Sequence, residues 1–516
     1  MSEPWVRFED EHLLAVAKPA GVNTHRADVH AQGGMYEWVQ RQRPTESLSV
    51  LHRLDKGTSG LLLFGKSHAA NRSLTTQFEA RTVTKRYELL VARDDRRPAT
   101  IHARRPIDGA PAETDLARQA TGSSLERWSA QPHTGRTHQV RVHATEAGLP
   151  VLGDAEHHGA AAPRLFLHAA ELAVRHPDGR ALSIGVDRPA SFDDVLEGHC
   201  VEAVLAALVA LEARAQLFDP ADTNAYLWID RHHDGFPGVR VERLGDVALV
   251  LSYSDDAVAL PAGWVDALQD TLDLRAVYLQ HRPRGGGDLP HLVAGTASDR
   301  FEVTELGVRY LIDLQASATS SGLFLDQRET RRELLRSDLP GKTVLNTFAH
   351  TGSFSVVAAL AGAETLTLDL SRRYLDWAAD NLRANGVDPA DHDQIYGDAL
   401  EWLDRFAKKG RSFDLVLVDP PSSSTPRKKG GARWVVERDL HDLVTRAARV
   451  VAPGGTLFVS TNLHRMTWLA FIDHLERGLA SAGRAGTTDT RTVPLDHRSG
   501  PGDPPYLKAA WVTLAD

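Results

Sequence analysis

The sequence predicts a protein of several domains that combines an α+β fold with an α/β fold. At 516 residues the chain is long enough for roughly three domains of about 150 residues each. Short β-like runs separated by turns dominate residues 1–195, which is typical of a domain built on a mixed sheet. From about residue 320, buried strands alternate with helical stretches. That alternation indicates an open, mostly parallel α/β sheet.

The individual elements support this division in chain order. In residues 1–195 we expect strands in the stretches HLLAVAKPAG, GLLLFGKS, KRYELLVA and HQVRVHATEAGLPVLGD. Residues 196–218 are expected to form an amphipathic connecting helix, and residues 219–315 a small α+β middle domain. Residues 316–516 form the α/β domain, whose buried strands are KTVLNTFA, AETLTLDLS, FDLVLVDPP and GGTLFVST.

The composition excludes several classes of protein. The single cysteine, Cys200, excludes a disulfide framework and a metal site built from cysteines. His157 and His158 have no ligand partner three or four residues away, so we expect no metal. We also expect no membrane span and no signal peptide, hence a cytoplasmic protein. The net charge of −9 decides little about RNA, because a local basic patch can lie on an acidic body.

One aspartate in the first domain has an unusual setting. Asp55 lies in HRLDKGTSGLLL, at a turn before an apolar strand, where a lone aspartate is most often a turn residue. In QVRVH, strand alternation places Val140 and Val142 on one face and Arg141 on the other. An arginine directed into a cleft is costly unless a carboxylate meets it, so we expect Asp55 to be its partner.

Nearly all of residues 5–190 resemble the RluA-type pseudouridine synthases, which modify ribosomal and transfer RNA. The resemblance implies a pseudouridine synthase fold, with Asp55 as the catalytic carboxylate, Arg141 as its salt-bridge partner and Tyr87 as the aromatic group beneath the uracil. Isomerising uridine needs no redox step, and an aromatic ring can support a base that has left its stack. The stretches that carry the resemblance are EDEHLLAVAKPAGV, HRLDKGTSGLLL, FEARTVTKRY, TGRTHQVRVH, GLPVLGD and RLFLHAAELAVRHP.

A second set of residues in the α/β domain is typical of a nucleoside-binding cleft. The loop after the first strand holds Gly352 without the Gly-x-Gly-x-x-Gly pattern of a dinucleotide site, which disfavours NAD. Asp369 ends the next strand, where a carboxylate can bind ribose hydroxyls. Asp398 follows at a position suited to an adenine amine. In FDLVLVDPP, prolines stiffen the loop that presents Asp419 and Pro420.

Residues from about 220 to 512 resemble the RlmI/RlmK-type methyltransferases of large-subunit ribosomal RNA. The resemblance rests on DGFPGVRVERLGDVALVL, SGLFLDQRETRRELL, VLNTFAHTGSFSV, LDLSRRYLDWAADNLRANG, DLVLVDPPSS and PPYLK. It implies a Rossmann-like class I methyltransferase fold that uses S-adenosyl-L-methionine, with Asp419 also serving in catalysis. The residues expected to bind the cofactor are Asn346, Phe348, Gly352, Asp369, Asp398, Asp419 and Pro420.

The residues also bear on which base atom receives the methyl group. Methylation at carbon 5 of cytosine needs a cysteine thiolate that adds to the ring. Where that cysteine would lie, the sequence has Thr461 and Asn462, and Cys200 is in the connecting helix. Guanine N7 carries a free lone pair and requires only proximity to the sulfonium. We therefore favour N7 of guanine, with another nitrogen as the alternative.

The sequence thus predicts one enzyme with two active sites on RNA, with large-subunit rRNA favoured over tRNA. Two alternatives remain: the synthase-like half could serve mainly to dock RNA, or the methyltransferase could act on a substrate other than RNA. The target positions, any coupling between the sites and the oligomeric state are left open by the sequence.

Overall fold

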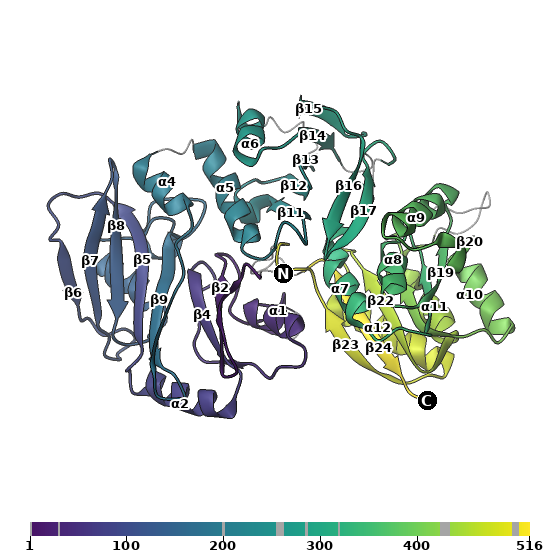
Figure 1. Ribbon diagram of the computed structural model, residues 1–516, viewed down its shortest axis with the longest axis horizontal. Helices are drawn as coiled ribbons and strands as arrows, with labels where there is room; N and C mark the ends of the chain where they lie inside the picture. Colours follow the sequence, from purple (N-terminus) through teal and green to yellow (C-terminus); the bar gives the residue numbers. More distant parts are fainter. Residues whose placement is uncertain are drawn as a thin grey trace.

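The computed structural model describes residues 3–28, 31–198, 202–253, 263–283, 287–317, 320–423, 434–497 and 505–516. Three sheets succeed one another along the chain, from the purple and blue N-terminal part through the teal centre to the green and yellow C-terminal part (Figure 1). Cys200 lies outside the described residues. Among the described residues, no helix is both long and apolar enough to cross a membrane.

The N-terminal part is built on a ten-stranded mixed sheet, as expected. Its main path runs β1-β2-β4-β9-β5-β8-β7-β6, with β3 paired to β4 and β10 to β9. Its pairs are antiparallel except for β4 and β9, which are parallel. The strands are β1 (Val6–Glu9), β2 (Leu13–Lys18), β3 (Ser49–Val50), β4 (Ser59–Gly65), β5 (Thr84–Ala92), β6 (Thr100–Ala103), β7 (Thr114–Thr121), β8 (Leu125–Pro132), β9 (Leu167–Arg175) and β10 (Ala181–Gly185).

Short helices connect and cover these strands. They are α1 (Met35–Gln42), α2 (His68–Glu79), α3 (Gln139–Glu146), the 3₁₀ turn η1 (Ala155–His157) and α4 (Ser191–Glu197). Helix α5 (Glu202–Ala215) lies within the range expected for the connecting helix. In Figure 1, α4 and α5 lie between the first sheet and the middle part of the chain.

The strand expected over QVRVH is wrong, because these residues form helix α3. The side chain of Gln139, at the first turn, accepts hydrogen bonds from Thr134 and from the Arg136 N–H. Val140 and Ala144, four residues apart, both pack into the core beneath β5 and β8. Five residues with alternating valines fit either period, and the four-residue spacing of the core contacts decides for the helix.

The middle part holds a five-stranded sheet and a separate hairpin. The sheet order is β11-β12-β13-β14-β15, in which only β13 and β14 are parallel, and β16 pairs with β17. One hydrophobic core joins this sheet to the first domain, because Trp38 and Trp228 belong to the same cluster of buried side chains. The elements are β11 (Ala225–Asp230), η2 (Arg231–Asp234), β12 (Val239–Leu244), β13 (Val247–Ser252), α6 (Trp264–Leu272), β14 (Ala276–His281), β15 (His291–Gly295), β16 (Arg300–Glu305) and β17 (Val308–Asp313).

The C-terminal part is the expected α/β sheet, in the order β20-β19-β18-β21-β22-β24-β23. All neighbours are parallel except β24, which is antiparallel to both β22 and β23. The strands are β18 (Thr343–Thr347), β19 (Glu364–Asp369), β20 (Asp393–Tyr396), β21 (Phe413–Val418), β22 (Val451–Thr461), β23 (Gly486–Arg491) and β24 (Lys508–Leu514).

Helices cover both faces of this sheet. Val344 packs with α7, α8 and α9, whereas its neighbour Leu345 packs with α10, α11 and α12, as strand alternation requires. Both faces are therefore buried, and the strands read as continuous apolar runs. The helices and turns are η3 (Leu325–Gln327), α7 (Arg328–Arg336), α8 (Ser353–Leu360), α9 (Arg372–Ala384), η4 (Pro389–Asp391), α10 (Ala399–Lys408), α11 (Val436–Ala448) and α12 (Trp468–Ala482).

The segment between β23 and β24 forms hydrogen bonds with all three parts of the chain, most of them at Asp496. The Asp496 carboxylate accepts hydrogen bonds from the Leu227 N–H (3.0 Å) and from Arg328 (2.7 Å). Its carbonyl oxygen accepts one from Arg214 at 2.9 Å. Nearby, the Gln32 amide of the first domain donates to the Pro494 carbonyl at 2.9 Å. This segment, residues 492–497, is called the tie segment below.

Candidate active sites

The turn before β4 places Asp55 in a cleft of about 690 Å³ in the first domain. The Thr58 N–H donates to the Asp55 carbonyl and closes the turn, and the carboxylate is 30 % exposed. Tyr87, His138 and Arg141 line the same cleft. Its walls hold more cationic than anionic side chains: Arg53, Arg81, Lys85, Arg136 and Arg141 against Asp55 and Glu79.

Arg141 does lie beside Asp55, but Asp55 is not its main partner. The nearest Arg141 nitrogen is 3.5 Å from the Asp55 carboxylate. The Nε and Nη2 atoms instead bind Asp154 in a two-bond fork, at 2.8 and 2.6 Å, and Nη2 also donates to Glu156 at 2.6 Å. The expected ion pair between Arg141 and Asp55 is therefore present, and the same guanidinium also binds Asp154 and Glu156.

The electrostatics of this group follow from its burial. Burial alone would lower the pKa of Arg141, but its bonds to Asp154 and Glu156 raise that pKa above its ordinary value. Burial would likewise raise the pKa of Asp154, yet the bond from Arg141 brings it below its usual range. Arg141 and Asp154 are thus both ionised at neutral pH, and the cation is held in place next to Asp55.

Tyr87 reaches the cleft from β5, where the pairing with β9 shifts register between Arg86 and Tyr87. Burial and, secondarily, the negative charge of Asp55 raise the pKa of the phenol above its ordinary value. Tyr87 therefore remains neutral and presents an aromatic ring beside the carboxylate. This placement agrees with the one that the sequence led us to expect.

The search of the sequence missed Asp154 and His138 as neighbours of Asp55. The His138 Nε2 lies 3.9 Å from the Asp55 carboxylate, and His138 has a left-handed backbone with φ +53° at the start of α3. Both residues stand inside stretches already singled out, GLPVLGD and TGRTHQVRVH. The signal in the sequence that could have identified these two residues is the polar residue at the end or at the turn of each stretch, next to a short helix.

In the C-terminal sheet, Asp369 fixes the loop that follows β18. One carboxylate oxygen accepts the His350 N–H at 2.9 Å and the other accepts the Ser371 N–H at 2.8 Å. Burial raises the pKa of Asp369. Phe348 and His350 in this loop have left-handed backbones, with φ of +54° and +51°. The loop and the carboxylate thus hold each other at the carboxyl ends of β18 and β19.

The glycine at position 352 is explained by its backbone conformation and by the packing around it, rather than by close approach to a phosphate. Its φ is +74°, in the left-handed region, and it caps the start of α8. A Cβ placed on it would lie 2.5 Å from the Ala378 Cβ in α9. The glycine therefore allows both the turn and the packing of α8 on α9.

Gly352→Ala is expected to destabilise the C-terminal domain more than Gly341→Ala does. Gly341 has the same φ of +74° but open space around its Cβ position, so its substitution costs only the backbone strain of about 1–2 kcal/mol. The clash with Ala378 adds about 1–3 kcal/mol for Gly352→Ala. Denaturant unfolding of the two variants measures the difference. Equal losses would show that the contact with Ala378 is relieved without cost.

Two of the residues expected to bind the cofactor, Asn346 and Asp398, form hydrogen bonds with other residues of the protein. Asn346 is buried, and its amide donates to Ser355 at 2.9 Å, inside the layer between β18 and α8. Asp398 caps α10 by accepting the Leu400 N–H at 2.9 Å. Both carboxamide and carboxylate groups thus have a local structural role in the fold.

Asp419 lies directly after β21, opposite the end of β22. Its carboxylate accepts hydrogen bonds from Ser460 (2.6 Å) and from Gln327 (3.1 Å), and Pro420 behind it is buried. Burial raises the pKa of Asp419 to about 6; the charge of Asp326 adds to the rise, and the two hydrogen bonds oppose it. Thr461 ends β22 in the same region.

The raised pKa of Asp419 predicts a pH-dependent stability. Since the folded-state value exceeds the ordinary one, folding favours the protonated form, and stability is lost as pH rises through about 6. Relative to the wild type, Asp419→Asn should therefore gain about 1 kcal/mol between pH 5 and pH 8. Thermal melting of both proteins at the two pH values measures this gain.

Asp414, on strand β21 that precedes Asp419, supplies the control for that measurement. Burial would raise its pKa, but the Thr343 N–H and Lys342 bring it below its usual range. It is fully ionised at both pH 5 and pH 8, so the cost of Asp414→Asn should not change between them. A constant difference for Asp419→Asn as well would contradict the raised pKa.

Comparison with known families agrees with both halves of this description. Residues 12–146 match the family of RNA pseudouridylate synthases, and residues 262–477 match the family of S-adenosylmethionine-dependent methyltransferases. The chain therefore combines two folds in one molecule, one matched by RNA pseudouridylate synthases and the other by methyltransferases. It carries an RNA pseudouridylate synthase domain followed by an S-adenosylmethionine-dependent methyltransferase domain, and its cofactor is S-adenosylmethionine.

Curated relatives match about a third of the chain. Ribosomal RNA large subunit methyltransferase K/L of Allochromatium vinosum is 44 % identical over 32 % of this chain and 22 % of its own length. Ribosomal RNA large subunit methyltransferase K of Neisseria meningitidis is 38 % identical over 36 % of this chain and 52 % of its own length. The chain thus spans between about a fifth and about half of the length of these relatives. The solved structure of SMU.776, described as a candidate methyltransferase complexed with SAH, has the same fold over 66 % of this chain and 86 % of its own, with 23 % identity and a TM-score of 0.55.

Proposed function

We propose that this chain modifies RNA twice, converting uridine to pseudouridine in the first domain and methylating a base of large-subunit rRNA in the third. The observation that carries the first activity is the gathering of Asp55, Tyr87 and Arg141 in one cleft. We further propose a cytoplasmic protein with domain boundaries near residues 195, 218 and 315.

In the first domain, Asp55 is the catalytic carboxylate. Arg141, anchored by Asp154, holds a fixed positive charge 3.5 Å from it in the same cleft. Tyr87 supports the uracil after the uridine has left its stack. The cationic walls of the cleft bind the flanking phosphates, because the phosphate backbone supplies most of the affinity for a nucleic acid.

In the third domain, the residues at the carboxyl ends of β18, β19 and β21 hold the cofactor and the target base. Asp369 would accept the ribose hydroxyls through the lone pairs that its two N–H bonds leave free. Asp419 and Pro420 would position the base. S-adenosylmethionine, when bound, supplies an electrophilic methyl group. The donor set fits such a nucleoside, since it offers a carboxylate and a loop shaped by Gly352 at adjoining strand ends.

Guanine N7 is the acceptor atom that the residues around Asp419 in the third domain support best. The end of β22 places Thr461 and Asn462 beside the Asp-Pro-Pro loop, where the Ser422 hydroxyl lies 3.4 Å from the Asn462 side chain. Neither residue can add covalently to a pyrimidine ring as a thiolate does. N7 has a lone pair and no proton to lose, so orientation against the methyl group suffices.

Mass spectrometry of large-subunit rRNA from a strain that lacks the gene tests both activities together. The deletion should remove one pseudouridine and one 7-methylguanine, and the intact gene should restore both. Loss of the methylated base alone would support a synthase-like half that only docks RNA. If the rRNA keeps both modifications, the proposal fails for this RNA.

A further inference from the structure

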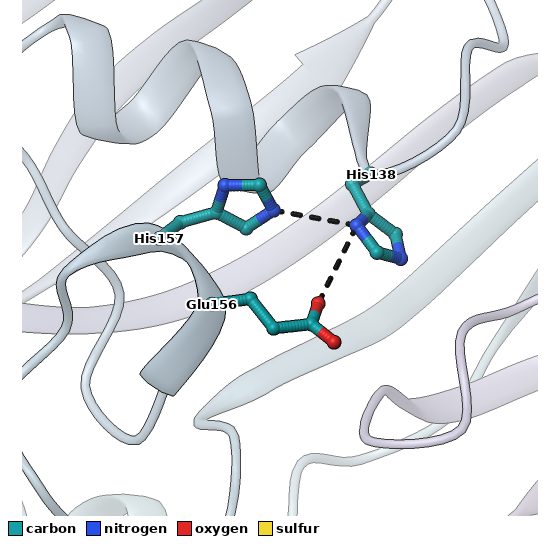
Figure 2. Close-up of side chains that lie close together, drawn as sticks. All are labelled: His138, Glu156 and His157. Carbon is teal, nitrogen blue, oxygen red and sulfur yellow. Dashed lines mark hydrogen bonds and ion pairs between the residues drawn. The ribbon is translucent and has the colours of Figure 1, made fainter.

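His138, which lines the Asp55 cleft, forms with two neighbouring side chains a cluster that the proposed reactions do not use. His138 lies at the start of α3, and Glu156 and His157 lie in η1, which packs against that helix (Figure 2). The His157 Nε2 and the His138 Nδ1 are 3.3 Å apart, and the Glu156 carboxylate is 3.6 Å from the same His138 nitrogen. One ligand atom from each residue lies within 4.8 Å of the others.

These separations suit three ligands of one small metal ion. With metal–ligand bonds of about 2.0–2.1 Å, neighbouring corners of a tetrahedron are about 3.3–3.4 Å apart. The two imidazoles already have that spacing, and their rings meet nearly at right angles, at 87°. In the absence of a metal the same 3.3 Å fits a hydrogen bond between the rings. The carboxylate lies 3.6 Å from the His138 nitrogen, within a few tenths of an ångström of the same spacing.

The backbone around the cluster holds both histidines in place. Thr145 of α3 donates to the His157 carbonyl at 3.0 Å, and Asp154 caps η1 through the His157 N–H. His138 is fixed by its left-handed backbone at the start of the same helix. Glu156 is 66 % exposed, so its carboxylate can turn toward a bound ion. Two of the three ligands are thus preorganised by one helix.

We propose that His138, Glu156 and His157 bind one divalent cation of borderline softness, such as Zn²⁺, and that this binding inhibits pseudouridine formation. Two imidazoles and one carboxylate leave a fourth position for water, and imidazole suits Zn²⁺ better than Mg²⁺ or Ca²⁺. The inhibitory part rests on the proposed synthase activity, whereas the binding part does not.

Inhibition follows from the two nitrogens of His138. A metal on Nδ1 leaves the proton on Nε2, the nitrogen that lies 3.9 Å from the Asp55 carboxylate. A metal-bound imidazole N–H next to that carboxylate competes with the nucleoside for it. The ion also draws Glu156 away from Arg141, whose guanidinium it now contacts at 2.6 Å. Both effects act on the carboxylate that the reaction needs free.

The members of this cluster are not spaced as a ligand motif in the sequence. His138 and His157 are 19 residues apart, and the packing of η1 on α3 brings them together. The expectation of no metal rests on the spacing of His157 from its sequence neighbours, and the proximity of His138 is visible only in the fold.

Calorimetric titration of the full chain, without an affinity tag, with ZnCl₂ tests the binding. His157→Asn removes one ligand and should weaken the interaction at the site at least about tenfold. His158→Asn is the matched control, because His158 is exposed, is outside the cluster and has a left-handed backbone that asparagine tolerates. Co²⁺ should give the visible absorption of a tetrahedral site in the wild type and in His158→Asn only. Melting curves verify that each variant is folded.

Pseudouridine formation is then measured with and without Zn²⁺, and after removal of the ion with EDTA. Zn²⁺ should inhibit the wild type and His158→Asn reversibly and leave His157→Asn unaffected, while Mg²⁺ has no effect. Equal Zn²⁺ affinity in the wild type and His157→Asn would overturn the site. Binding without inhibition would overturn the inhibitory role. Because the titration needs no activity, its result is independent of whether the synthase proposal holds.

Discussion

Asp55→Asn is expected to abolish pseudouridine formation while methyl transfer by the same chain continues. The substitution keeps the shape of the side chain but removes the charge that Arg141 supports at 3.5 Å. Loss of a catalytic carboxylate typically costs at least about a thousandfold in rate. The measurement is release of tritium from RNA labelled at carbon 5 of uridine, alongside methyl incorporation from S-adenosylmethionine.

The reciprocal variant provides the control for this result. Asp419→Asn should keep pseudouridine formation and reduce methyl incorporation, since the two carboxylates lie in different domains. The Asp55 side chain is 30 % exposed, and its ion pair with Arg141 spans 3.5 Å, so the melting temperature should change little. A folded Asp55→Asn protein with activity within tenfold of the wild type would remove Asp55 from catalysis.

Asp496→Ala is expected to destabilise the whole protein by about 3–5 kcal/mol, the usual loss when one partner of a buried ion pair is removed. The Asp496 and Arg328 side chains are both fully buried, and their nearest atoms are 2.7 Å apart. Without Asp496, Arg328 loses its 2.7 Å partner and keeps its bond to Glu305, which also binds Arg331, and the Leu227 N–H loses its acceptor. Denaturant unfolding followed by tryptophan fluorescence measures the loss.

Asp489→Ala is the matched comparison, because this residue also pairs with an arginine, Arg491, at 2.7 Å. Its side chain is 68 % exposed, and surface pairs contribute only about 0–1 kcal/mol. The two substitutions lie seven positions apart in one stretch of chain, so the contrast isolates burial. Similar small losses for both variants would mean that water reaches Arg328 once Asp496 is gone.

The sequence was sufficient for the C-terminal sheet and for the carboxylates at its edge. Apolar strands such as FDLVLV alternate with helical stretches along the chain. This alternation is typical of an open α/β sheet. Asp369 and Asp419 then follow at strand ends, where parallel strands bring polar residues together. Strand order did not have to be known for either residue to be placed at that edge.

Short segments and long-range partners could not be predicted in the same way. QVRVH reads as a strand because five residues cannot distinguish a period of two from a helix, and the contacts of Val140 and Ala144 with the core decide it. The expected ion pair of Arg141 with Asp55 is present, but the additional partner Asp154 was not expected from a strand. Asn346 and Asp398 show a different limit, since a polar side chain at a strand end can equally serve the fold.

The tie segment has a consequence for how the molecule is made. Domains fold largely from the N-terminus onward during synthesis, at about 5–20 residues per second. Asp496 follows Arg328 by 168 residues, so the ribosome needs roughly 8 to 34 seconds between them at that speed. For that interval Glu305 of the middle domain faces Arg328 and Arg331 of α7 without the carboxylate of Asp496, and the Leu227 N–H lacks its acceptor. Completion of the middle domain thus depends on a segment translated long after it, and a nascent chain stalled before Asp496 should be a substrate for chaperones and proteases.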